Sequence, residues 1–154
     1  MMRATLSLLI GLLLAQPAAA HWEYSFWGMT PAEVIAASGG AARALPAARQ
    51  RAAAEARMTY RAEAQFEEGD LALEVAFAFD DVTNGLVCVS YAARNALQSD
   101  ALREWLIHRF GQPERTVRDP ASNEENISWR EPDNIDLFLM PLTRPVVLHC
   151  ARGT

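Results

Sequence analysis

The chain has 154 residues, of which 51% are hydrophobic, enough for one domain with a sizeable core. Its formal net charge is −5, and all 14 of its basic residues are arginine. An acidic chain gives no reason to expect nucleic-acid binding, and the lack of lysine excludes Schiff-base and P-loop chemistry.

The first twenty residues have the three parts of a secretory signal peptide. A short basic start ends at Arg3, an apolar run covers residues 6–14, and small residues lead to Ala20. That run is well short of the roughly 20 residues that cross a bilayer as a helix. We therefore expect a signal peptide at 1–20 and one exported domain at 21–154, periplasmic or extracellular, without a membrane span.

The centre of the chain has the alternation of a β-strand. Every second position is large and apolar: Leu71, Leu73, Val75, Phe77 and Phe79. This period of two predicts a strand over 71–79 with one apolar face. Asn84-Gly85 is a turn signal, and an apolar strand is expected at 86–91. A similar alternation at 58–66 completes a predicted three-stranded antiparallel meander.

The segment before the meander predicts a strand and a short helix. Large aromatic side chains alternate at 22–27, which is typical of a first strand. Thr30 and Glu33 have the spacing of a capping box around Pro31, and Gly39-Gly40 ends the helix. Residues 41–57 are rich in alanine and arginine, and their pattern leaves a surface helix and a mobile connector both open.

A second helix is expected after the meander. Asn95 or Ser99 caps it, and Gly111 and Pro113 close it. Apolar side chains recur at helical spacing: Leu97, Leu102, Trp105, Leu106 and Phe110. Burying this stripe on the meander would cover its apolar face, with roughly 1.5–3 kcal/mol for each large side chain before entropy is subtracted.

The rest of the chain predicts a loop and three short strands. Residues 115–125 are polar, and apolar runs follow at 127–130, 135–140 and 146–152. The predicted fold is therefore α+β, in the order β-α-(β)3-α-(β)3. It is an antiparallel sheet with two principal α-helices packed on one face.

The two cysteines, Cys88 and Cys150, both fall in predicted strands. An exported chain meets an oxidising compartment, so we expect a disulfide between them. It would close a loop of roughly 60 residues, worth on the order of 4 kcal/mol in the chain-entropy estimate. Two buried free thiols are the alternative. A metal site is the weaker reading, because CxxC spacing is lacking.

Short motifs resemble a family of small exported bacterial proteins of unknown role. Residues 27–34, Trp-Gly-Met-Thr-Pro-Ala-Glu-Val, match its WG(M/T)(S/T)xxEV start, and Phe110-Gly111-Gln112-Pro113 matches its (Y/F)GxP helix end. The matching structural positions, with the helix tryptophan, are Trp27, Gly28, Thr30, Glu33, Trp105, Phe110, Gly111 and Pro113. The resemblance implies a sheet packed on helices, loosely similar to the β-lactamase-inhibitor-protein fold, and it brings no catalytic motif.

His21 is the sharpest candidate for chemistry. Cleavage after Ala20 would make it the first residue, whose amine and imidazole can chelate Cu(II) together with a second histidine, His108 or His149. The alternative is an ordinary start of an edge strand. A serine nucleophile is weaker, since the G-x-S-x-G elbow is absent.

The sequence is thus rich in motifs that form structure and poor in polar side chains that could come together in a catalytic site. The sequence favours a non-enzymatic exported module, without a cofactor, that binds an unknown protein or envelope component through an open sheet face or an edge strand. A copper-binding protein using His21 is the alternative.

Overall fold

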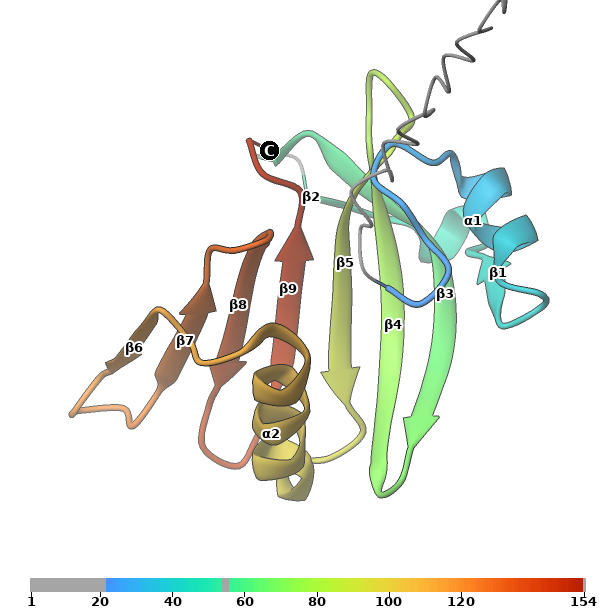
Figure 1. Cartoon of the computed structure of the whole chain (residues 1–154). Coiled ribbons are helices and arrows are strands. Elements are labelled where there is room, and N and C mark those ends of the chain that lie inside the picture. Colours follow the sequence, from blue (N-terminus) through green and yellow to red (C-terminus); the bar gives the residue numbers. More distant parts are fainter. Residues whose placement is uncertain (1–21, 54–55, 154) are drawn as a thin grey trace, which may run out of the picture.

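The computed structural model describes residues 22–53 and 56–153, which form one large antiparallel sheet (Figure 1). The predicted signal peptide and His21 lie outside these residues. The described strands are β1 (Ala42–Ala44), β2 (Arg51–Ala53), β3 (Met58–Glu68), β4 (Leu71–Asp80), β5 (Leu86–Ala93), β6 (Arg115–Arg118), β7 (Glu125–Trp129), β8 (Asn134–Leu139) and β9 (Val146–Cys150). The helices are α1 (Pro31–Ala37) and α2 (Ser99–Phe110), and two 3₁₀ turns are η1 (Ala47–Arg49) and η3 (Ala96–Gln98).

The predicted fold class is wrong, because the described chain is mainly β-sheet. Its nine strands follow the order β1-β3-β4-β5-β9-β8-β7-β6, with β2 also on β3. Five strands lie between the helices and four follow α2, which replaces the expected β-α-(β)3-α-(β)3. Neither helix is a principal layer: α2 has 12 residues, and α1 has seven with only Val34 buried.

Three segments account for this error. The aromatic alternation at 22–27 folds into turns, since the Ser25 N–H and hydroxyl both donate to the Trp22 carbonyl. Residues 41–57 supply β1 and β2, which pair with the same edge of β3 and are separated by residues 45–50. The expected polar loop contains β6, an edge strand whose residues are all exposed. Small and charged side chains give an edge strand no apolar period to detect.

The predicted meander is confirmed. β3, β4 and β5 pair antiparallel in order, and β5 continues onto β9. The second helix is also confirmed at its C-terminal end, where Gly111 takes φ 80° and its N–H donates to the Ile107 carbonyl. Positive φ at this position is readily available to glycine.

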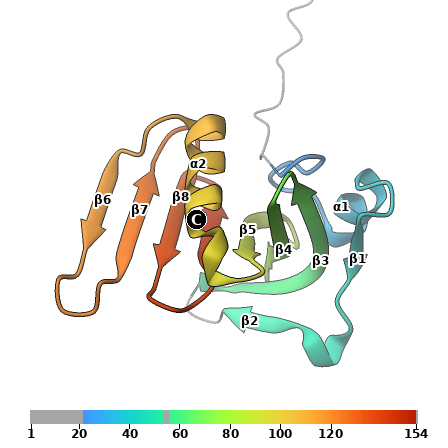
Figure 2. The same cartoon turned by 90° about the horizontal axis from the view of Figure 1, so that it is seen from below.

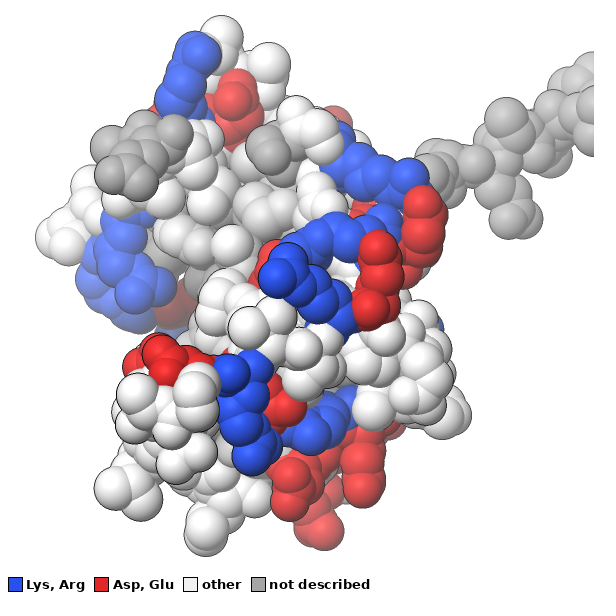
Figure 3. Space-filling view, turned by 90° about the vertical axis from the view of Figure 1, so that its left-hand side faces the viewer, with Lys and Arg blue, Asp and Glu red and all other residues white. Residues whose placement is uncertain are grey.

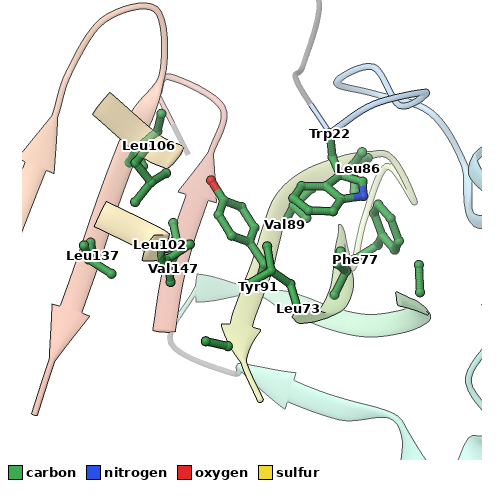
Figure 4. Packing of buried hydrophobic residues seen from close by; sticks show 14 of the residues in the cluster. Trp22, Leu73, Phe77, Leu86, Val89, Tyr91, Leu102, Leu106, Leu137 and Val147 are labelled. Atoms are coloured by element: carbon green, nitrogen blue, oxygen red, sulfur yellow. The ribbon is translucent and has the colours of Figure 1, made fainter. Parts of the chain in front are cut away.

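One face of the sheet is covered by α2 and by the segment before α1. Figure 4 shows Leu102 and Leu106 lying against Leu137 and Val147, and Trp22 lying near Leu86 and Val89. Leu97, which the helical spacing added to the apolar stripe, is 95% exposed because it lies in η3 instead of α2.

The segment before α1 is held on the sheet through its backbone. Gly28 N–H donates to the Leu86 carbonyl at 2.9 Å, and Leu86 N–H donates to the Met29 carbonyl at 2.7 Å. The chains approach so closely that a Cβ on Gly85 would lie 3.1 Å from the Gly28 Cα. The expected first strand therefore covers the start of β5 instead of extending the sheet.

The predicted disulfide is confirmed. Cys88 on β5 lies directly opposite Cys150 on β9, and their sulfur atoms are 2.05 Å apart. The bond joins the meander to the last strand. It packs with Met58 and Ala78, in a small cluster separate from the main core.

Candidate binding surface

The second face of the sheet is hollow in its middle. Figure 2 shows β3 strongly bent, with α2 on one side of the sheet and β2 on the other. Register places Ala76 opposite Ser90, and Ala92 opposite Glu74, on this second face. Their neighbours in sequence, such as Phe77, point into the covered core. Because alanine and serine are short, the floor here lies below the surrounding side chains.

We call the larger depression the arginine hollow. It encloses about 620 Å³ and crosses β3, β4, β5 and β9 from the segment that contains β1 and β2. Its charged lining consists of Arg43, Arg49, Arg51, Arg144, Glu63 and Glu74, above a floor of Ala76, Ser90 and Ala92. Four arginines and two glutamates give this lining a formal charge of +2, whereas the whole chain carries −5.

Three of the four arginines are held by the two glutamates. The Glu63 carboxylate accepts from Arg43 Nε at 2.8 Å and from Arg49 at 2.6 Å. Arg144 donates to Glu74 at 2.5 Å. These pairs are well exposed on the arginine side, so they fix side-chain positions more than they add stability.

Arg51 is arranged differently. Its guanidinium carbon lies 5.5 Å from the centre of the Tyr60 ring, on the neighbouring strand, and it has no carboxylate partner among residues 22–53 and 56–153. Burial raises the pKa of Tyr60, and the Arg51 charge and a hydrogen bond from Ser90 oppose that rise. Arg51 and Ser90 line the arginine hollow, and Tyr60 lies next to both of them.

A second depression, which we call the apolar hollow, adjoins the first. It encloses about 480 Å³ between β6 and the end of β8, and Val146 lines both hollows. Val117, Phe138 and Met140 contribute apolar side chains that are 37% to 44% exposed, and Asp119, Glu124 and Glu125 line it as well. Large apolar side chains that remain exposed side by side often mark a binding site.

Charged side chains of both signs surround the β6 end of the molecule (Figure 3). Glu125 accepts hydrogen bonds from Arg103 on α2 at 2.7 Å and from Arg118 on β6 at 3.2 Å. Burial raises the pKa of Glu125, but these two hydrogen bonds and the charges behind them outweigh it and hold the pKa below its ordinary value. This network fixes β6 against α2.

A buried polar cluster lies on the covered face. Asp133, in the turn before β8, accepts from Trp27 Nε1 at 3.1 Å and lies 3.0 Å from His149 Nε2. Phe110 packs edge-on against the His149 ring at 5.4 Å. The cluster joins four segments of the chain: the segment before α1, α2, the turn before β8, and β9. Since His149 has no exposed surface, its role is to tie the fold together.

The remaining motif residues also have structural contacts. Thr30 and Glu33 form the predicted capping box, and the hydrogen bonds from Thr30 lower the pKa of Glu33. Trp105 donates to Glu68 at 3.2 Å, and the Gly111 carbonyl accepts from Trp129 at 2.9 Å. Pro113 is half-buried just after α2. Neither hollow is lined by any of these motif residues.

The residues considered for chemistry do not converge in the described part of the chain. His108 is exposed on α2, and no group of three or more potential metal ligands occurs among the described residues. His21 lies outside them, so the copper site stays a prediction. Ser90 pairs with Leu148 while Val89 pairs with His149, which puts Ser90 and His149 on opposite faces of the sheet.

Sequence reasoning missed the arginine hollow. Arg43, Arg49 and Arg51 belong to residues 41–57, whose structure the sequence left open. The floor residues are small side chains, and the strands were predicted from the large apolar side chains that alternate with them. The available signal was the run of small side chains opposite the apolar face of β4. No helix of the described residues has the length and hydropathy needed to span a membrane.

No protein-family model, curated protein or solved structure matches this chain.

Proposed function

We propose that this chain is a non-enzymatic, exported binding module that holds a polypeptide segment of a partner protein on the uncovered face of its sheet. The observation that carries the proposal is the pair of adjoining hollows on that face, one lined by arginine and one apolar, with Val146 between them.

Charge and polarity define the occupant. The arginine hollow has a lining charge of +2 on a chain of net charge −5, so it favours an acidic group over a basic one. The apolar hollow offers exposed Phe138 and Met140 to a large apolar side chain. A polypeptide segment that carries an acidic side chain a few residues from an apolar one fits both hollows at once.

The disulfide between Cys88 and Cys150 supports export, because such bonds persist in oxidising compartments. The pattern of residues 1–20 supports the same conclusion. We therefore place the binding module in the periplasm or outside the cell, where an envelope or secreted protein would supply the segment.

A random dodecapeptide library displayed on phage tests the proposal with a defined probe. The library is selected on the oxidised domain 21–154, and enriched clones are counter-screened on Ala76→Trp, which fills the arginine hollow, and Phe138→Ser, which removes an apolar wall. Ala32→Trp, exposed on α1, is the matched control. Thermal unfolding verifies that each variant is folded.

We expect enriched peptides to contain acidic and apolar residues, and to lose at least tenfold in affinity on either hollow variant but not on Ala32→Trp. Absence of enrichment, or enriched peptides that bind folded Ala76→Trp and Phe138→Ser unchanged, would refute the proposed function. Enrichment of basic peptides would refute the assigned occupant.

A further inference from the structure

We infer that Arg51 is the residue of the arginine hollow that binds a carboxylate of the partner segment, which makes it the specificity-determining residue of the surface. This inference rests on the proposed function. It adds the chemical group that is recognised and the side chain that recognises it.

The first argument is the availability of donors. Arg43 and Arg49 already donate to Glu63, and Arg144 donates to Glu74, so an incoming anion at any of them would share the guanidinium with a carboxylate that repels it. The Arg51 guanidinium carbon lies over the Tyr60 ring, and no carboxylate of the described residues pairs with it. A guanidinium carries five N–H donors, so a contact with one aromatic ring leaves donors for an anion.

The second argument is the fixed position of Arg51. Its backbone, in β2, pairs with that of Tyr60 in β3, and its guanidinium lies over the Tyr60 ring. An arginine already held against an aromatic ring loses less freedom when a ligand binds than a mobile one does. Ser90 lies on the floor of the same hollow, next to the Tyr60 side chain that holds Arg51.

The third argument concerns the geometry of the anion. The lining charge of +2 attracts a negative group to the arginine hollow. The planar fork of arginine matches a carboxylate in a two-bond arrangement, which is the geometry that lysine cannot reproduce.

The test uses the most enriched library peptide, made synthetically, and a twin in which each Asp and Glu is replaced by Asn and Gln. Both are titrated by fluorescence anisotropy against the unsubstituted domain, Arg51→Gln and Arg51→Lys. Arg109→Gln is the matched control, because Arg109 lies on α2, far from the hollow, and forms its ion pair with Glu23.

We expect Arg51→Gln to weaken the acidic peptide by about tenfold to a hundredfold, the range for a charge-assisted pair of hydrogen bonds. Arg51→Lys should restore only part of the loss, and the amide twin should bind Arg51→Gln and the unsubstituted domain equally. Arg109→Gln should bind the acidic peptide as the unsubstituted domain does.

Equal affinity of the acidic peptide for Arg51→Gln and the unsubstituted domain would overturn the inference while leaving the proposed function intact. Full rescue by Arg51→Lys would also overturn it, since charge alone would then suffice. Failure of the library to yield any peptide would refute the proposed function, and the inference with it. The two results described before it would refute the inference alone.

Discussion

The two faces of the sheet are built from the same strands and behave in opposite ways. On β4, Leu73, Val75 and Phe77 point to the covered face and are buried beneath α2 and the N-terminal segment. Ala72 and Ala76, from the alternate positions, point to the other face and remain half-exposed. The large side chains of one strand thus give a face on which other elements pack, and its small side chains give a face that stays open to a ligand.

The largest effect is expected from truncation of the covered face. Phe77→Ala removes a side chain with no exposed surface, and we expect a loss of about 3–5 kcal/mol in the free energy of unfolding. Denaturant titration of the oxidised domain measures it. The matched change on the other face, Ala76→Leu, should alter that free energy by less than about 0.5 kcal/mol. Similar losses for both variants would break the distinction between the faces.

Removal of the disulfide is expected to have the next largest effect on stability. The disulfide lies on the face of the sheet opposite α2. The double change Cys88→Ala with Cys150→Ala opens a link between residues 62 apart in sequence. Chain-entropy arguments then give a loss of up to about 4 kcal/mol in the free energy of unfolding. Chemical denaturation with and without reductant checks this. A loss below about 1 kcal/mol would indicate that β5 and β9 are held by the covered core alone.

A smaller, pH-dependent effect is expected at Glu125, where α2 meets β6. Since its pKa in the folded state lies below the ordinary value of 4.5, its stabilising contribution is present above that pH and is lost as the pH falls through the lowered value. Glu125→Gln should cost about 1 kcal/mol near neutral pH and progressively less below pH 4.5. Thermal unfolding of both proteins from pH 7 to pH 3 measures this. A stability difference between the two proteins that stayed constant over this range would contradict the prediction.

The three tyrosines give a spectroscopic comparison of the faces. Burial raises the pKa of Tyr24 to about 12 and raises that of Tyr91 further, and both lie on the covered side. Tyr60, on the open face, has a raised pKa that the Arg51 charge and Ser90 hydrogen bond moderate. Absorbance at 295 nm should therefore show little tyrosinate at pH 10, with Tyr60 ionising first.

The sign for stability follows from the same pKa values. Tyrosines of the unfolded chain ionise near pH 10, before the buried ones, so the folded state should lose stability as the pH rises from 10 toward 12. Tyr60→Phe identifies the first titration step. Normal titration of all three tyrosines near pH 10 in the folded protein would show that neither face buries them.

The sequence predicted the parts of the fold whose signals are local or strictly periodic. The Thr30–Glu33 capping box, the end of α2 at Gly111 and the meander of β3 to β5 depend on neighbouring residues, and all three are present. The aromatic alternation at 22–27 was misinterpreted because a turn at Ser25, formed by tertiary packing, overrides the strand pattern. The faces of β6 are both exposed, so its sequence has no period to detect.

The candidate surface was expected only in outline. An open sheet face was predicted as the place of binding, but its hollows depend on side chains that are short, such as Ala76 and Ser90, and on arginines from an edge segment. The small residues that alternate with the large ones along β4 are visible in the sequence, but the sequence does not show which small residues of other strands lie beside them. Their importance appears only when register puts them side by side.

Mapping the bound peptide by NMR tests the binding role of the open face most directly. Backbone and methyl shifts of the oxidised, isotope-labelled domain are followed during titration with the most enriched library peptide. We predict that the perturbed signals cluster at Ala76, Ser90, Ala92 and Val146, and that the signals of α2 and of the segment before α1 stay unchanged. Perturbations confined to α2 or to the segment before α1, with the open face silent, would contradict the proposed function.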